Sequence, residues 1–105
     1  MEERMNRFPY LEISPEKREV RYMGYVLPLT QGEQAVLWAV LCSDGFADKQ
    51  DIKNIIDADM STDAKVSVES VPVHVFSINR KAKTANGRKI VEFRRNKGYF
   101  INKDM

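Results

Sequence analysis

Cysteine and histidine are scarce in this chain of 105 residues, which contains one of each, Cys42 and His74. A lone cysteine cannot close an internal disulfide, and Cys42 ends the apolar run AVLWAVLC, which predicts a packed thiol in a reducing compartment. No Cys/His cluster is present to hold zinc, and no glycine-rich loop is present to cradle a nucleotide. We expect a packed, hydrogen-bonded structural role for His74. The sequence therefore predicts no catalytic residue, no metal site and no cofactor.

Long apolar segments are also missing. The run of eight is the longest in the chain, well short of the roughly 20 apolar residues that a membrane span needs. The opening MEERMNRF lacks the apolar core of a signal peptide, so we expect a cytoplasmic protein that makes no membrane contact. No repeat and no Pro/Gly/Ser-rich linker divides the chain. We therefore predict a single domain over residues 1–105, with residues 1–9 as a flexible N-terminal segment.

Charge is nearly balanced overall but unevenly distributed along the chain. The formal net charge is only +2. From residue 71 onward nine basic residues face two acidic ones, a net of +7, whereas the first seventy residues hold eight basic and thirteen acidic residues, a net of −5. This division favours an oriented contact with a polyanion such as nucleic acid. The alternative from charge alone is a solvated basic surface without a ligand.

The first third of the chain has the pattern of short strands. YLEI (Tyr10–Ile13), EVRY (Glu19–Tyr22) and YVLPLT (Tyr25–Thr30) alternate imperfectly between apolar and polar residues and are separated by turn-rich segments. They predict a small antiparallel meander. Because Pro28 cannot donate a ladder hydrogen bond, the third strand should lie at an edge or end there.

Two helices are predicted after the strands. Thr30 and Glu33 have the spacing of a capping box, which starts a helix at Gln31 that continues to about Ser43. This helix is apolar nearly all round and should be the hub of the core. Asp48 is the expected N-cap of a second helix over Lys49 to Asp57. The acidic, polar segment from Asp57 to Lys65 has the composition of a loop.

A third helix is predicted from Val71, with Ser70 as its N-cap, to about Lys83. Pro72 is tolerated in a first turn, where its missing amide hydrogen has no partner within the helix. Four apolar residues share one face and form a core stripe: Val71, Val75, Ile78 and Ala82. The opposite face carries Val73 and Phe76, and such exposed apolar neighbours often mark a contact site.

The last segment has the pattern of a basic β-hairpin. KIVEF (Lys89–Phe93) and GYFI (Gly98–Ile101) are strand-like, and Asn96 and Gly98 between them tolerate the positive φ that a tight turn requires. The hairpin would follow the third helix directly. A helix beside a basic hairpin is the layout of a winged helix-turn-helix domain.

At four places the sequence resembles the OmpR/PhoB-type winged-helix effector domain of bacterial two-component response regulators. LTQGEQAVLWAVL (Leu29–Leu41) resembles its Leu-Thr-x-x-Glu and leucine-rich helix, and Phe46–Ile52 is similar to its second-helix entry. VPVHVFSINRKA resembles Val-Asp-Val-His-Ile-x-x-Leu-Arg-x-Lys-Leu, and VEFRRNKGY resembles Ile-x-Thr-Val-Arg-Gly-x-Gly-Tyr. The resemblance, which runs from Tyr10 to Ile101, implies an α+β fold: a winged helix-turn-helix with an N-terminal antiparallel β-meander, a three-helix core and a C-terminal β-hairpin wing.

The resemblance also implies a function and a set of contacts. The function is sequence-specific binding of double-stranded DNA in bacterial transcription regulation, with the third helix in the major groove and the wing in the minor groove. The implied DNA contacts are Ser70, Val73, Phe76, Ser77, Arg80, Lys81, Arg94, Arg95 and Lys97. Arg95 matches the wing arginine that enters the minor groove in relatives, and Val73 is placed to meet a thymine methyl group. The loop before the third helix contacts RNA polymerase in relatives, so Asp57, Asp59 and Asp63 are candidate contacts with polymerase or a regulatory protein.

Several residues depart from the pattern of the resemblance. Pro72, Phe76, Ser77 and Asn79 replace charged residues common in the third helix, which loses positive charge, and Phe93 stands where the wing has threonine. The alternative function is a winged-helix protein–protein interaction module that uses Val73 and Phe76, with weak or no DNA binding. Because no receiver domain lies within these 105 residues, we expect an excised effector domain or a free-standing protein that is monomeric or weakly self-associating.

Overall fold

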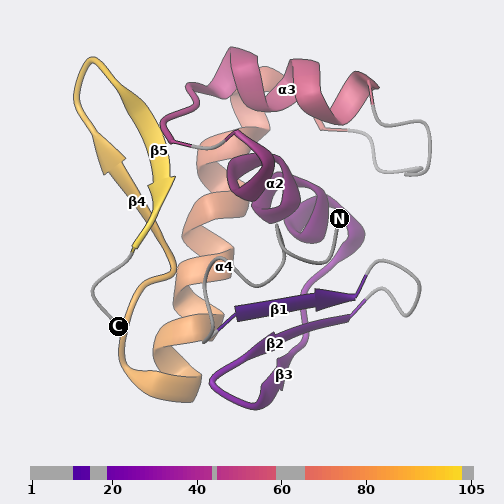
Figure 1. Ribbon diagram of the computed structural model, residues 1–105, viewed down its shortest axis with the longest axis vertical. Helices are drawn as coiled ribbons and strands as arrows, with labels where there is room; N and C mark the ends of the chain where they lie inside the picture. Colours follow the sequence, from indigo (N-terminus) through magenta and orange to yellow (C-terminus); the bar gives the residue numbers. More distant parts are fainter. Residues whose placement is uncertain (1–10, 15–18, 44, 59–65, 103–105) are drawn as a thin grey trace.

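Two small antiparallel sheets flank a group of three helices (Figure 1). The computed structural model describes residues 11–14, 19–43, 45–58 and 66–102. The elements in chain order are β1 (Leu11–Ser14), β2 (Glu19–Tyr22), β3 (Tyr25–Leu27), α2 (Gln31–Cys42), α3 (Lys49–Ala58), the 3₁₀ turn η1 (Val68–Ser70), α4 (Val71–Asn86), β4 (Val91–Arg94) and β5 (Gly98–Ile101). The predicted meander, three helices and hairpin are all present in this order. The flexible segment predicted for residues 1–9 lies outside the described residues.

The meander forms where alternating residues can bury one face. Its strand order is β1-β2-β3, and β2 and β3 are joined by a tight turn in which Met23 (φ 54°) and Gly24 (φ 86°) both adopt positive φ. Two successive positive φ angles are typical of a type I′ hairpin turn. β3 lies at an edge of the sheet and ends at Leu27, directly before Pro28, so the prediction for this proline is confirmed. The strand is shorter than the predicted Tyr25–Thr30.

α2 is the hub of the core, as predicted. The capping box is complete: the Thr30 hydroxyl accepts from the Glu33 amide at 3.2 Å, and the Glu33 carboxylate accepts from the Thr30 amide at 2.9 Å. Seven of its twelve residues are buried, and it contacts α3, α4 and β5. No helix within the described ranges is both long enough and apolar enough to cross a membrane.

α3 begins with a reciprocal cap and a link to the wing. The Asp48 carboxylate accepts from the Asp51 amide at 2.8 Å, while the Asp51 carboxylate accepts from the Asp48 amide at 3.2 Å, so Asp48 caps the helix as predicted. The preceding residue, Ala47, exchanges two backbone hydrogen bonds with Tyr99 of β5, at 3.0 and 2.8 Å. The sequence pattern did not predict this bridge, which joins the wing to the helical body.

α4 buries the predicted core stripe. Val71, Val75, Ile78 and Ala82 are all buried, with relative exposures of 7% or less. The helix extends to Asn86, three residues beyond the predicted end at Lys83, because Gly87 supplies the terminating conformation. Gly87 lies in the left-handed region (φ 78°), and its amide donates to the Lys83 carbonyl at 2.7 Å.

Candidate nucleic-acid interface

The face of α4 opposite the core stripe is exposed and apolar at its N-terminal half. Val73 is 66% exposed and Phe76 is 67% exposed, and Arg80 continues the same exposed face one turn further along. Their spacings of three and four residues place the three side chains on one side of the helix. No acidic residue occurs in α4. The exposed face of the helix is therefore apolar at Val73 and Phe76 and becomes cationic one turn later, at Arg80.

The wing presents its cations around a tight turn. The Lys97 amide donates to the Arg94 carbonyl at 3.0 Å, and Asn96 (φ 67°) and Gly98 (φ 119°) take the positive φ angles predicted for them. Arg94, Arg95 and Lys97 are all exposed. Within the part of the chain that the structure describes, Arg95 has no salt-bridge partner, so its charge is available to a ligand.

Two of the wing cations lie over aromatic rings. The Arg94 guanidinium is 5.9 Å from the centroid of Phe100, and the Lys97 ammonium is 5.6 Å from that of Phe46. Phe46 and Phe100 pack edge to face with centroids 5.1 Å apart. Cation–π contacts at exposed sites contribute roughly 0.5–1 kcal/mol each, enough to restrict where these long side chains lie. Phe46, from the α2–α3 connection, thus helps to position the wing charges, a role that the sequence pattern did not reveal.

Asn79 fastens α4 to the start of the wing. Its Nδ2 donates to the Val91 carbonyl at 2.8 Å, and its Oδ1 accepts from the amides of Ile90 and Val91 at 3.1 and 3.0 Å. The side chain is only 9% exposed, and each of its hydrogen-bonding atoms is partnered. The sequence pattern shows Asn79 only as a departure from the arginine of the motif Leu-Arg-x-Lys. The structure shows that it fixes the position of β4 relative to α4.

Lys81 and Ser77 turn toward α2. The Lys81 ammonium pairs with the Glu33 carboxylate at 2.7 Å and donates to the Pro28 carbonyl at 2.9 Å, and Ser77 lies near enough to Glu33 to lower the pKa of that carboxylate. Both residues were predicted DNA contacts. Because the Lys81 charge is matched within the protein, the proposed contacts rest on the other cations of α4 and the wing.

The Glu33 carboxylate is buried at 5% exposure, and its environment determines its charge. Burial raises the pKa of Glu33, but hydrogen bonds from Lys81, the Thr30 amide and Ser77, with the charge of Lys81, together hold that pKa below its ordinary value of 4.5. The ionised form therefore stabilises the fold above about pH 4.5, and this stabilisation is lost as the pH falls through the lower folded-state pKa.

Replacing Lys81 with methionine should lower the free energy of unfolding at pH 7 by about 2–3 kcal/mol, because Glu33 would remain buried without its cation. The pKa of Glu33 should rise in the variant, so protonation relieves the cost and the difference from the native protein should shrink toward pH 4. Urea denaturation at both pH values measures this. Lys53→Met is the matched control, since Lys53 pairs with the exposed Asp57 and its loss should cost less than about 1 kcal/mol. An equal deficit for Lys81→Met at both pH values would contradict the assignment.

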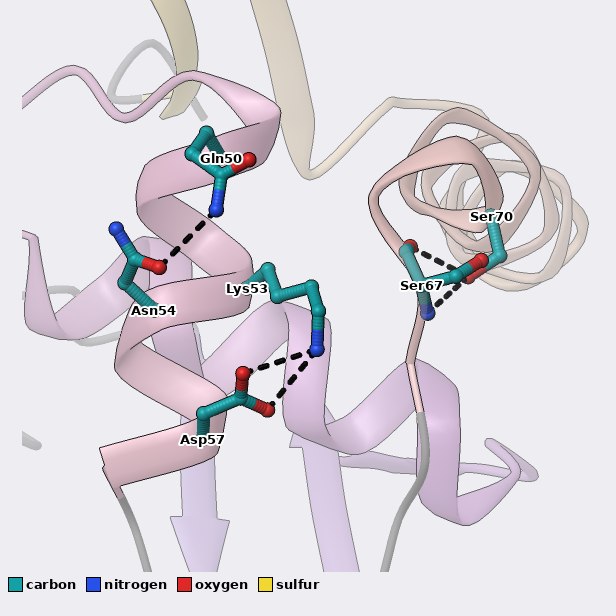
Figure 2. Close-up of polar contacts among 6 residues, drawn as sticks. All are labelled: Gln50, Lys53, Asn54, Asp57, Ser67 and Ser70. Atoms are coloured by element: carbon teal, nitrogen blue, oxygen red, sulfur yellow. Dashed lines mark hydrogen bonds and ion pairs between the residues drawn. The ribbon is translucent and has the colours of Figure 1, made fainter.

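Ser70 lies at the predicted N-cap position, but its side chain points backward. Its hydroxyl donates to the Ser67 carbonyl at 2.9 Å and accepts from the Ser67 amide at 3.1 Å (Figure 2). These bonds belong to η1, the turn that precedes α4, and the cap of α4 has no side-chain hydrogen bond. The hydroxyl is thus held at the beginning of α4. Its contact with a DNA phosphate remains a prediction.

Asp57 lies on the exposed side of α3. The Lys53 ammonium donates to both of its carboxylate oxygens, at 3.1 and 2.9 Å (Figure 2). A neighbouring pair, Gln50 and Asn54, bonds along the same helix at 3.1 Å. The other two candidate partner contacts, Asp59 and Asp63, lie outside the described residues.

Among the described residues, no group of three or more His, Cys, Asp or Glu side chains is close enough together to hold a metal ion. His74 is half-buried and packs against α2, where a Cβ added to Gly32 would lie 2.9 Å from the imidazole Cε1. The packing predicted for His74 is thus present, whereas the predicted hydrogen bond of its side chain is not among the described contacts. Cys42 is half-buried and is not part of a disulfide.

No family model and no curated protein matches the sequence. Solved structures do match this fold. The RstA DNA-binding domain of Klebsiella pneumoniae, in complex with the RstA box, is 24% identical with a TM-score of 0.66, covering 90% of this chain and 92% of that one. The DNA-binding domain of the response regulator AdeR, in complex with an intercistronic region, is 17% identical with a TM-score of 0.69, covering 89% and 93%.

A third match comes from a longer protein. It is a streptococcal redox sensor described as evolved from two-component response regulators. The sensor is 16% identical to this chain, with a TM-score of 0.71, and the match covers 90% of this chain but only 40% of the sensor. The structural neighbours thus include OmpR/PhoB-family response regulator DNA-binding domains. The fold of this chain is the winged helix-turn-helix of those domains, as the sequence resemblance predicted.

Proposed function

We propose that this protein binds double-stranded DNA sequence-specifically in bacterial transcription regulation, with α4 in the major groove and the β4–β5 wing in the adjacent minor groove. One observation carries the proposal: the exposed face of α4 and the exposed cations of the wing belong to two elements that Asn79 holds together. Two solved domains of the same fold are described in complex with DNA.

The dimensions of α4 suit a major groove. A helix of sixteen residues is about 24 Å long, and its outer diameter of about 10–12 Å matches the width of the groove in B-form DNA. Arg80 and Lys83 are exposed on α4, and three more exposed cations lie in the wing. Cations at these places can replace counterions on the phosphate rows to either side of the groove.

Wing contact is tested by replacing Arg95 with alanine. Binding to duplex DNA should weaken across all sequences, and the slope of log affinity against log salt concentration should fall by about one, the contribution of a single cation near the phosphates. Fluorescence anisotropy with labelled duplexes over a range of salt concentrations measures both effects.

Arg21→Ala serves as the matched control for charge. Arg21 lies in β2 of the N-terminal sheet and pairs with Glu19 at 2.7 Å, so its loss changes the net charge equally but should leave the salt slope unchanged. Equal slopes for Arg95→Ala and the native protein would remove the wing from the interface. Failure of the native protein to bind any duplex at low salt would rule out the proposed function.

A second candidate function is capture of a protein partner on Val73 and Phe76, which the high exposure of these two side chains favours. The exposed surface of α3 near Asp57 is a further candidate contact, with RNA polymerase or a regulatory protein, and is compatible with either function. Absence of duplex binding, combined with partner capture or self-association that depends on Phe76, would select this second function.

A further inference from the structure

Two large apolar side chains are exposed on the helix proposed to read DNA. Val73 and Phe76 are about two-thirds exposed, and neither has a hydrogen-bonding atom in its side chain. Exposed apolar neighbours on a polar surface usually mark a contact site. They cannot read the donors and acceptors by which guanine, adenine and cytosine are told apart in the major groove.

The major groove offers one apolar feature to such side chains, the C5-methyl group of thymine. Valine and phenylalanine both make favourable contact with a methyl group, and burying it removes apolar surface from water on both partners. Arg80, one turn beyond Phe76, is an exposed cation on the same helix face, and Arg95 is an exposed cation of the wing. The complementary partner therefore carries apolar spots within a polyanionic surface, which describes the major groove of thymine-containing DNA.

We infer that Phe76, together with Val73, reads thymine methyl groups, so that the bound site carries thymines at neighbouring positions in the major groove. The inference rests on the proposed function and names the sequence class that this function would select. Three residues of α-helix rise about 4.5 Å, between one and two base-pair steps of 3.4 Å. The two side chains are thus spaced to meet methyl groups on adjacent or next-adjacent base pairs.

Deoxyuridine provides the test, because it pairs as thymidine does and lacks only the methyl group. A binding duplex is first selected by the native protein from a random library, and its thymines are then replaced by uracil one at a time. Affinity should fall about fourfold at each position where a methyl group is buried, the value expected for one apolar carbon. Positions outside the α4 contact should not respond.

Variants assign the effect to particular side chains. In Phe76→Ala and Val73→Ala the thymine-to-uracil penalty should disappear at the position that each residue contacts, and remain at the other position. Arg80→Ala is the matched control on the same helix face: it should weaken binding to the thymine and uracil duplexes by the same factor. Thermal unfolding of each variant, expected to be unchanged because the side chains are exposed, separates these effects from misfolding.

The outcomes are distinguishable. Duplex binding with equal affinity for thymine and uracil would overturn this inference and leave the proposed function intact. A penalty that persists in both Phe76→Ala and Val73→Ala would assign methyl recognition to another element and overturn the inference. Stronger binding to a duplex with 5-methylcytosine at the same positions than to the thymine duplex would overturn the assignment to thymine. No selected duplex at all would overturn the inference and the proposed function together.

Discussion

Replacing Gly98 with alanine should lower the free energy of unfolding by roughly 3–5 kcal/mol, the sum of backbone strain and steric overlap. Gly98 has φ 119°, a conformation that residues with a Cβ rarely adopt. An added Cβ would lie 2.6 Å from the Ala47 carbonyl carbon and 2.8 Å from the Asp48 amide nitrogen. Backbone atoms cannot move aside as a side chain can, so the wing would have to separate from the segment that leads into α3. Chemical denaturation measures the loss.

Gly24→Ala is the matched control for backbone strain. Gly24 also has a positive φ, 86°, but an added Cβ would meet no atom within 4 Å. Its replacement should therefore cost only about 1–2 kcal/mol, the strain of the left-handed region alone. If both variants lose the same free energy, the close approach of Gly98 to Ala47 contributes nothing, and the wing is held by its other contacts.

Gly98 also shows where sequence reasoning succeeds. Elements that depend on local patterns were predicted: the capping box at Thr30, the Asp48 cap, the core stripe of α4 and the positive φ of Asn96 and Gly98. In each case neighbours in sequence determine the outcome, through side-chain periodicity or the steric limits of single residues. The ends of helices were predicted less accurately. α4 runs to Asn86 and not to Lys83, because Gly87, the last residue of TANG, terminates it.

Contacts between distant segments could not be predicted in the same way. Nothing in Lys81 itself indicates that it pairs with Glu33, forty-eight residues earlier, because the partner is fixed only when α2 and α4 pack. The bridge between Ala47 and Tyr99 likewise appears only in the folded chain. The candidate interface was therefore predicted as a set of exposed residues, while the groups that hold α4 and the wing in place emerged from the structure.

Asn79 is the most consequential of these groups for the proposed interface. A helix in one groove and a wing in the next must keep a fixed separation, since a misplacement of either would lose its contacts. Ala47 and Tyr99 tie the wing to the α2–α3 connection near the hairpin turn, and Asn79 ties it to α4 at the other end of the hairpin. Two attachments at separate points restrain both the position of the hairpin and its angle.

Replacing Asn79 with alanine tests this attachment, and Thr84→Ala is the matched control, because it also removes a polar side chain from α4. Its hydroxyl is exposed and donates only to the Arg80 carbonyl within the described contacts, at 3.0 Å, so the substitution should change stability by less than about 0.5 kcal/mol. If Asn79→Ala and Thr84→Ala have the same free energy of unfolding, water replaces the hydrogen bonds of Asn79 at no cost.

Asn79→Ala should lower the free energy of unfolding by roughly 2–4 kcal/mol, because it leaves the Ile90 and Val91 amides and the Val91 carbonyl without their partner in a buried place. A purely global loss would accelerate amide exchange throughout the protein. Loss of a local attachment should accelerate exchange most at Ile90 and Val91, whose amides donate to Asn79 Oδ1, while the β5 amides paired to β4 keep more of their protection. Hydrogen exchange measured residue by residue separates the two. Because the wing would then have lost one of its two attachments, its position relative to α4 would be less restrained, and duplex affinity should fall further than the loss of stability alone explains, at a temperature where the variant is still folded.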